Sequence, residues 1–236
     1  MLGSLERHPW RWTLALLLPL IVFPQIDIGV SGLFFQPETR TFVLRTHPLG
    51  DFVRKTLPLI LFVLAAAIAL AGLGAAWRKR PVAGLSPRLA AFVVAALALG
   101  PGLVVNTLFK DNWGRPRPST IVEFGGQSHY VRAGWPSNQC PDNCSFPSGH
   151  AALGFWMVAV ALAAPAAWRR PAVIAALVFG TAVGVVRIAQ GGHFLSDVVF
   201  SGVIVVGLTL GLRRLILPPS ERPSRKNNGW DWGQHR

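Results

Sequence analysis

The sequence predicts an all-α protein that crosses a membrane six times. Of its 236 residues, 51% are hydrophobic and only 14% are charged, and the mean hydropathy is +0.42, a balance that soluble domains rarely show. A helix needs about 20 apolar residues to cross about 30 Å of hydrocarbon. Six runs meet this need: Trp12–Val30, Thr56–Trp77, Leu89–Phe109, His150–Trp168, Ala172–Val186 and Phe194–Leu212.

The basic residues indicate the orientation of the chain. A net charge of +13 in a soluble protein suggests nucleic acid, but here Lys and Arg gather beside the apolar runs, as the positive-inside rule predicts. If the N-terminus is cytoplasmic, 14 of the 23 basic residues lie on that side. We therefore expect both termini to be cytoplasmic and no nucleic-acid partner. The fourth and fifth runs are expected to form a tight hairpin with Arg169, Arg170 and Pro171 at its turn.

One long polar segment, residues 110–147, separates the third and fourth runs. A loop of this length in a compact protein is usually functional. Cys140 and Cys144 lie in it on the non-cytoplasmic side, where they either form a local disulfide or remain two free thiols. We expect residues 1–217 to form one six-helix domain that includes this loop, and residues 218–236 to be a disordered, basic cytoplasmic tail.

Alternating spans bring distant polar residues to one membrane face. Ionisable groups cost about 2.5 to 3.5 kcal/mol in hydrocarbon, so such residues indicate a functional site. The ends of the third and fifth runs and the starts of the fourth and sixth share one side. They carry Lys110 with Arg117, then Ser148, Gly149 and His150, then Arg187, and finally His193 with Asp197.

These residue types suit the binding of an anion, most simply a phosphate. Cations around a helix N-terminus attract an anion, because the first N–H groups lack intrahelical partners and the helix dipole favours negative charge. Ser148 can cap that terminus, and Gly149 lets the backbone come close. His193 and Asp197 are four residues apart, which on a helix places the carboxylate within reach of one ring nitrogen and leaves the other free to act.

The spacing of these residues resembles the three-part signature of the type 2 phosphatidic acid phosphatase superfamily. Its parts are Lys110, six residues and Arg117–Pro118; PSGH at 147–150; and Arg187, five residues, His193, three residues and Asp197. Val186 stands where that family usually has serine, so we place Val186 outside the site. The stretches GPGLVVN, FKDNWGRPRP, QCPDNCSF and QGGHFLSDVVF are similar to the bacterial lipid A 4′-phosphatase branch.

The resemblance implies a metal-independent lipid phosphatase of the bacterial inner membrane, with its site facing the periplasm. His193 is then the nucleophile that forms a phosphohistidine, oriented by Asp197, and His150 protonates the leaving alkoxide and activates water. Lys110, Arg117 and Arg187 stabilise the nonbridging oxygens. No cofactor and no metal are expected, because the acids on that side form no ligand-like cluster with histidines.

The substrate stays open at this stage. Removal of the lipid A 4′-phosphate competes with activity on undecaprenyl pyrophosphate, phosphatidylglycerol phosphate or phosphatidic acid. Vanadate haloperoxidases share the anion-binding pattern, but they are soluble. A transporter of anionic lipids binds the same headgroup without cleaving it.

Several further residues allow two interpretations each. Asp27 near the end of the first run is expected to lie at the interface with water. Arg115 either helps to bind phosphate or lies in a polar loop, and His129 is expected to be solvated. The segment Ser31–Lys55, with its arginines, is either an interfacial connector or a surface beside an anionic headgroup.

Overall fold

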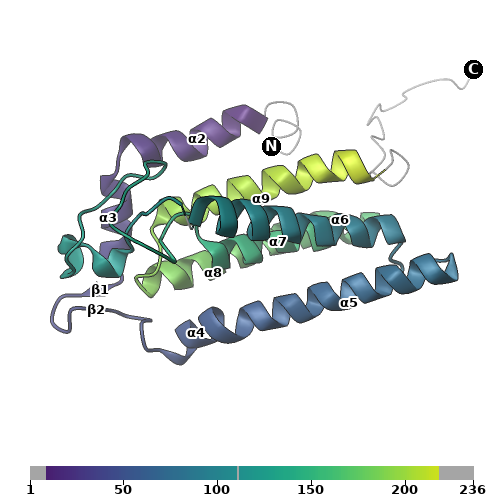
Figure 1. Ribbon diagram of the computed structural model, residues 1–236, viewed down its shortest axis with the longest axis horizontal. Helices are drawn as coiled ribbons and strands as arrows, with labels where there is room; N and C mark the ends of the chain where they lie inside the picture. The colour runs from purple at the N-terminus through teal and green to yellow at the C-terminus, as the bar shows by residue number, and fades with distance from the viewer. Residues whose placement is uncertain (1–8, 111, 218–236) are drawn as a thin grey trace, which may run out of the picture.

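The computed structural model describes residues 9–110 and 112–217, which are mostly helical, as the predicted all-α class requires (Figure 1). The first elements are α2 (Pro9–Val22), α3 (Gln25–Gly32), the antiparallel strands β1 (Phe35–Gln36) and β2 (Thr41–Phe42), α4 (Pro48–Asp51), the π-helix η1 (Phe52–Thr56) and α5 (Leu57–Arg78). They are followed by α6 (Pro87–Leu97), the π-helix η2 (Ala98–Lys110), the short 3-10 helices η3 (Pro118–Thr120) and η4 (Val122–Phe124), α7 (Gly149–Leu162), α8 (Ala166–Ala189) and α9 (Leu195–Ile216). The predicted tail, 218–236, lies outside the described residues.

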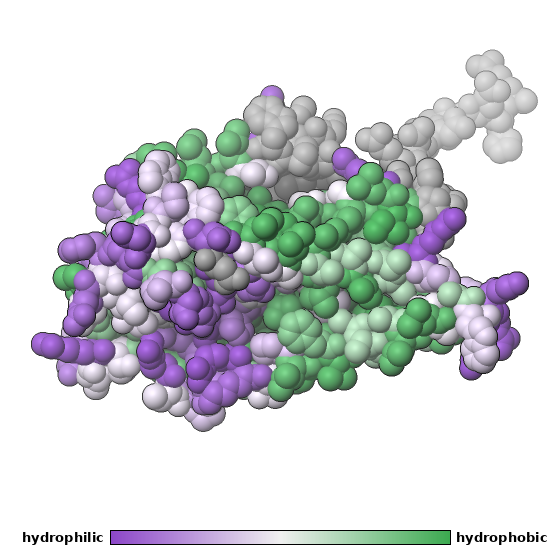
Figure 2. All heavy atoms as spheres, in the orientation of Figure 1, coloured by the Kyte–Doolittle hydropathy of each residue, from purple (hydrophilic) through white to green (hydrophobic). Residues whose placement is uncertain are grey.

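The membrane character of the chain is confirmed by the length and apolarity of its helices. Among the described residues, four stretches are long and apolar enough to cross a membrane: Pro48–Arg78, Pro87–Lys110, Ala166–Ala189 and Leu195–Ile216. The helices α2 and α3 add a fifth if the bent pair is one span. On the face that Figure 2 shows, apolar residues cover the side of the bundle, and polar residues gather most extensively at the end that carries α3 and α4. The arrangement of six spans remains a prediction.

The first predicted span is not a straight helix. Its two parts, α2 and α3, meet at an angle of 85°. The break lies at Phe23 and Pro24, where proline supplies no N–H for the helical ladder and its ring opposes continuation of the helix. The bend directs α3 across the end of the bundle, and this brings Asp27 into the protein interior, where it is 1% exposed.

The hairpin between the fourth and fifth predicted spans lies elsewhere than expected. The helix α7 ends at Leu162 and α8 begins at Ala166, so Arg169, Arg170 and Pro171 lie within the first turns of α8 and not in the turn. The reason is local: Pro165 is extended, and its carbonyl accepts hydrogen bonds from the N–H groups of Trp168 and Arg169, which starts the helix early. The prediction of a turn at these three residues was wrong.

The short helix α7 is the centre of the bundle. It packs against α6, α8, α9 and η2, and eleven of its 14 residues are buried. It approaches α8 closely at a glycine pair, since a Cβ built on Gly154 would lie 2.9 Å from the Cα of Gly180, as small residues allow between membrane helices. The indole N–H of Trp156 donates to the carbonyl of Val93 over 2.9 Å. The start of α7 is therefore held firmly in place.

Candidate active site

The residues of the second and third motifs meet at the end of the bundle where α7 and α9 begin. The backbone N–H of Ser148 donates to the carbonyl of Asp197 over 3.2 Å. The hydroxyl of Ser201, one turn further along α9, donates to the carbonyl of Ser148 over 2.9 Å. These two bonds fix the N-terminus of α7 against the first turns of α9, although about 50 residues separate them in the chain.

His193 is buried and presents one unpaired nitrogen. The ring is 1% exposed, and its Nδ1 lies 2.7 Å from the carbonyl oxygen of Ser145. A carbonyl only accepts, so Nδ1 carries the hydrogen and Nε2 keeps its lone pair. Within the part of the chain that the structure describes, Nε2 has no hydrogen-bond partner. Burial, followed by the charges of Arg187 and Lys110, lowers the pKa of His193 well below its ordinary value, so the ring is neutral.

Asp197 does not form the predicted hydrogen bond to His193. Its Oδ2 lies 3.8 Å from Nδ1 of the ring, too far for a hydrogen bond. The physical reason is that His193 precedes the N-cap residue, Phe194, so the helical i, i+4 geometry does not apply to it. The carboxylate instead accepts hydrogen bonds from the Phe194 N–H over 2.7 Å and from the hydroxyl of Ser145. Asp197 therefore acts on the ring through Ser145.

Arg115 binds two buried carboxylates behind the site. Its guanidinium is fully buried and is ion-paired with Asp197 and, over 2.8 Å, with Asp27. Its Nε donates to the carbonyl of Val131 over 2.8 Å, and its Cζ lies 4.4 Å from the centre of the Phe194 ring. Neither interpretation from the sequence describes this role. Arg115 is not solvated, and its guanidinium is occupied by these buried partners and so is not available to bind phosphate.

Asp27 completes this buried network, and the expectation of an interfacial position was wrong. One carboxylate oxygen accepts the backbone N–H of Ser196 over 2.8 Å, and the other accepts the hydroxyl of Tyr130 over 3.0 Å in addition to Arg115. Burial, followed by the negative charge of Asp27, raises the pKa of Tyr130, so its hydroxyl keeps the hydrogen that it donates. An acidic residue inside an apolar run was the sequence signal that could have indicated this position.

The three predicted cations lie around the two histidines. The charges of Arg187, Lys110 and Arg117 all act on His193, and so does His150. Arg187 is buried; its Nη1 donates to the side chain of Gln190, and its Nε has no hydrogen-bond partner among the described residues.

Arg117 and Gly192 complete this group. Arg117 donates from Nε and Nη2 to the carbonyl of Asn143, over 3.1 and 2.5 Å. A Cβ on Gly192 would lie 2.6 Å from Nη2 of Arg187, so this glycine makes room for the guanidinium.

His150 lies in the first turn of α7. The side chain of Ser148 caps this helix and accepts the N–H of Ala151 over 3.4 Å. Packing favours glycine at position 149, because a Cβ there would lie 2.6 Å from Oδ1 of Asn106. The Nε2 of His150 lies 3.1 Å from the carbonyl oxygen of Arg54, so it donates to that oxygen.

The segment around Arg45 and Arg54 forms part of the wall of the site. The N–H of Leu44 donates to the carbonyl of Ala189 at the end of α8 over 3.0 Å. The charges of Arg45 and Arg54 act on Arg117, and together with burial, the largest cause, they lower its pKa. The sequence left this segment between a connector and a headgroup surface, and no motif marked it as adjacent to the site.

Other predicted positions are more peripheral. Cys140 and Cys144 are joined as a disulfide with a Cα–Cα distance of 5.7 Å, directly before Ser145. Val186 packs against the hydrophobic core, and His129 is exposed. The described residues contain no group of three or more His, Cys, Asp or Glu side chains that could hold a metal ion, and metal independence stays a prediction.

Fold and site together define a class, that of helical membrane proteins in which histidines and cations gather at one end of the bundle. The chain belongs to the PAP2 superfamily, whose family model matches residues 89–218. It is 37% identical over 190 residues to the lipid A 4′-phosphatase of Francisella tularensis subsp. novicida, and the matched region covers 78% of this chain and 83% of the relative.

Two further relatives are also lipid A 4′-phosphatases. The lipid A 4′-phosphatase of Rhizobium etli is 32% identical, over 86% of this chain and 84% of its own length. That of Rhizobium leguminosarum is 31% identical, over 86% of this chain and 93% of its own length. No solved structure matches the chain significantly. The family match begins in α6, so the contacts that Asp27 and Arg54 make with the site come from outside it.

Proposed function

We propose that this protein is a membrane lipid phosphatase that removes the 4′-phosphate of lipid A. The observation that carries the chemistry is the neutral, buried ring of His193, whose Nε2 has no hydrogen-bond partner among the described residues and lies within the field of three cations. The choice of lipid A is supported by the three relatives, all of which are lipid A 4′-phosphatases.

The first chemical step transfers the phosphoryl group to the enzyme. Nε2 of His193 attacks phosphorus, an N–P bond forms, and the bond between phosphorus and the 4′ oxygen breaks. His150 donates a proton to the leaving alkoxide. The carbonyl of Arg54, which accepts from Nε2 of His150, stabilises the protonated ring before this transfer.

The second step returns the enzyme to its starting state. His150, now neutral, takes a proton from water as the water oxygen attacks phosphorus, and the N–P bond breaks to release inorganic phosphate. Lys110, Arg117 and Arg187 hold the nonbridging oxygens in both steps, and in phosphoryl transfer this positioning and charge stabilisation is most of the catalysis. First-turn N–H groups at Gly149 add to the anion site.

The buried network of Asp27, Arg115 and Asp197 gives the nucleophile its orientation. Asp197 holds the hydroxyl of Ser145, and the carbonyl of the same residue holds Nδ1 of His193. Because Nδ1 donates throughout, the carbonyl stabilises the positive charge that the ring acquires in the phosphohistidine.

The proposed topology has six spans over residues 1–217 in the bacterial inner membrane, with both termini cytoplasmic and the site at the periplasmic face. It is supported by the positive-inside distribution of Lys and Arg and by the polar residues gathered around α3 and α4 (Figure 2). Cysteine labelling of intact cells at Trp135, an exposed residue of the long loop, tests it: Trp135→Cys in the background Cys140→Ser, Cys144→Ser should react with a membrane-impermeant maleimide.

Phosphate release tests the function itself. Purified protein in detergent should release phosphate from lipid A in the presence of a chelator, and His193→Ala should abolish the release. Activity that disappears with chelator and returns with a divalent metal contradicts the mechanism. Mass spectrometry of lipid A from expressing cells should show loss of one phosphate, assigned to the 4′ position by fragmentation. Unchanged lipid A together with dephosphorylated undecaprenyl lipid identifies the competing substrate.

A further inference from the structure

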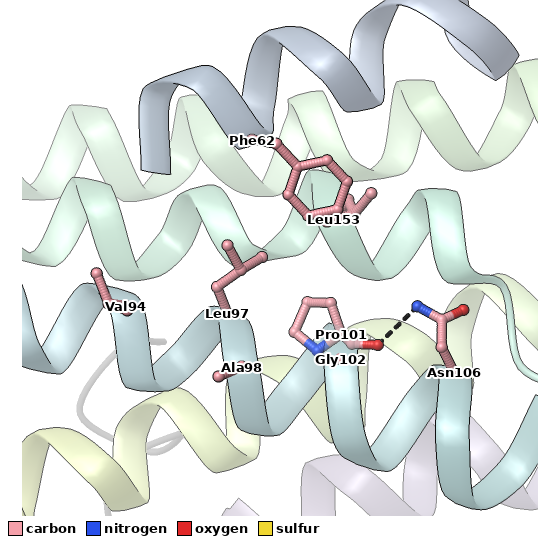
Figure 3. A pocket seen from close by; sticks show the side chains of 8 residues that line it. All are labelled: Phe62, Val94, Leu97, Ala98, Pro101, Gly102, Asn106 and Leu153. Atoms are coloured by element: carbon pink, nitrogen blue, oxygen red, sulfur yellow. Dashed lines mark hydrogen bonds between the residues drawn. The ribbon is translucent and has the colours of Figure 1, made fainter. Parts of the chain in front are cut away.

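The three cations of the candidate site are supported in different ways. Lys110 ends η2 and Arg187 lies in the last turn of α8, so each is carried by a helix. The helix η2 is tied further by the side chain of Asn106, which donates to the carbonyl of Pro101 over 2.7 Å (Figure 3). Arg117 lies instead in the long loop, directly before η3. Its guanidinium therefore needs support from elsewhere in that loop.

This support comes from a single backbone carbonyl. Nε and Nη2 of Arg117 both donate to the carbonyl oxygen of Asn143, over 3.1 and 2.5 Å. Within the described part of the chain, no other hydrogen bond holds this guanidinium. Because both donors lie on one edge of the planar group, Nη1 on the other side is left for an anion. The position of the Asn143 carbonyl therefore decides where Nη1 points.

The backbone around Asn143 lacks the hydrogen bonds that usually fix a loop. Residues 138–144 make no backbone-to-backbone hydrogen bond to any residue that the structure describes. Asn143 itself is exposed and has a φ of 45°. This left-handed conformation is uncommon for residues other than glycine, although asparagine adopts it more readily than most. Something other than the backbone must keep this carbonyl in place.

The disulfide between Cys140 and Cys144 supplies the constraint. Asn143 lies inside the short ring that this bond closes, directly before Cys144. Cys144 is buried, and the next residue, Ser145, is tied to the buried network, because its N–H donates to the carbonyl of Arg115 over 2.9 Å. One end of the ring is therefore anchored in the protein interior, and the disulfide ties the rest of the ring to that end.

We propose that the Cys140–Cys144 disulfide is a positioning element of the active site. It fixes the carbonyl of Asn143 and thereby holds Arg117 in the orientation that binds the phosphate. The inference rests on the proposed function, in which Arg117 stabilises a nonbridging oxygen. Disulfides persist in oxidising compartments, so the enzyme is fully active only where this loop is oxidised.

Reduction of the disulfide displaces the cation and leaves the nucleophile in place. Ser145 has hydrogen bonds of its own, from its N–H to the carbonyl of Arg115 and from its hydroxyl to Asp197. Its carbonyl therefore stays beside Nδ1 of His193 when the ring opens. A reduced enzyme keeps the same chemistry at a lower rate.

Reduction tests the proposal through activity. Dithiothreitol converts the disulfide to two thiols and itself becomes a cyclic disulfide, and the chain has only these two cysteines. The kcat/KM for lipid A should fall by about tenfold, less than for the loss of a whole donor, and should recover when oxidised glutathione re-forms the bond. The variant Cys140→Ser, Cys144→Ser should have the lower activity and be insensitive to dithiothreitol. Unchanged activity after complete reduction would overturn the proposal.

A double comparison separates positioning of Arg117 from a general loss of structure. In Arg117→Ala the cation is already absent, so dithiothreitol should change the residual kcat/KM of this variant by less than about twofold, as expected of two changes that act through one group. A disulfide that only stabilises the loop would lower the activity by the same factor with and without Arg117. That result would contradict the proposed role.

A third measurement needs no catalysis. Inorganic phosphate that binds the folded protein raises its melting temperature. The rise should be larger in the oxidised wild type than in Cys140→Ser, Cys144→Ser, and this difference should disappear when both proteins also carry Arg117→Ala. Equal rises in the two proteins that keep Arg117, zero included, overturn the proposal. If the wild type does not hydrolyse lipid A, the proposed function fails, and the phosphate measurement still decides on the disulfide.

Discussion

The imidazole of His193 is oriented by the backbone of Ser145, whose carbonyl oxygen lies 2.7 Å from Nδ1. The carboxylate of Asp197 is 3.8 Å from the same nitrogen, too far for a hydrogen bond, and is linked to the ring through Ser145, whose hydroxyl it accepts. The nucleophile therefore depends on a short loop segment held by a buried carboxylate, and the carboxylate in turn depends on Arg115 and, beyond it, on Asp27.

Removal of the charge at Asp27 should destabilise the protein and reduce its activity. Asp27→Ala leaves the fully buried Arg115 with only one carboxylate partner, and breaking a buried ion pair typically costs about 3 to 5 kcal/mol. The melting temperature should fall measurably in a thermal unfolding assay in detergent. Asp51→Ala is the matched control, because Asp51 is half exposed in its pairs with Arg54 and Lys55. A melting temperature equal to that of the wild type in Asp27→Ala would show that the network is not structural.

Gly192→Ala should separate activity from stability. A Cβ there would lie 2.6 Å from Nη2 of Arg187, and the flexible guanidinium can move away, so the melting temperature should change little. The displaced Arg187 then stabilises the transferring phosphoryl group less well. We expect kcat to fall by about 10 to 100-fold, less than the loss of about 100 to 1000-fold seen when one stabilising donor is removed, because the guanidinium is displaced and not lost. Gly207→Ala, where a Cβ meets nothing within 4 Å, should leave both quantities unchanged. Unchanged kcat in Gly192→Ala would exclude the proposed role of Arg187.

The pH dependence of kcat/KM should reflect the lowered pKa of His193. The nucleophile must be unprotonated, so activity is lost as the pH falls through its pKa, and the acid limb should lie well below the ordinary value of 6.5. Lys110→Gln removes one of the charges that lower this pKa, so the limb should move to higher pH in addition to any loss of rate. Lys79→Gln, at the far end of α5, should leave the limb where it is. A wild-type limb near 6.5 would be incompatible with a buried, neutral nucleophile.

Ser145→Ala should have a milder effect than Asp197→Ala on both stability and kcat. The first substitution removes one hydroxyl and keeps the carbonyl that orients His193, so we expect a loss of about 1 kcal/mol in stability and a modest fall in kcat. The second leaves Arg115 buried without one of its two partners and should cost more in both quantities. The comparison requires purified proteins, phosphate release from lipid A and thermal unfolding. A kcat equal to that of the wild type in Ser145→Ala would mean that Asp197 does not act on His193 through the Ser145 hydroxyl.

The sequence predicted the family and the helical membrane fold because both depend on local patterns. Apolar runs of sufficient length exclude most soluble folds. Spans that alternate across a bilayer bring the residues of the three motifs to one membrane face, whatever the details of helix packing: Lys110, Arg117, His150, Arg187 and His193. The PAP2 membership that this spacing indicated is confirmed.

Hydrogen-bond partners were decided only by the tertiary structure, since they depend on where helices begin and break. Pro24 interrupts the first predicted span and carries Asp27 inward to a partner 88 residues away, and no local pattern specifies that pairing. His193 lies one residue before the N-cap of α9, so the i, i+4 rule could not describe its contact with Asp197. Charges far apart in the chain meet because burial without partners is too costly, and only the folded chain determines which partners are within reach.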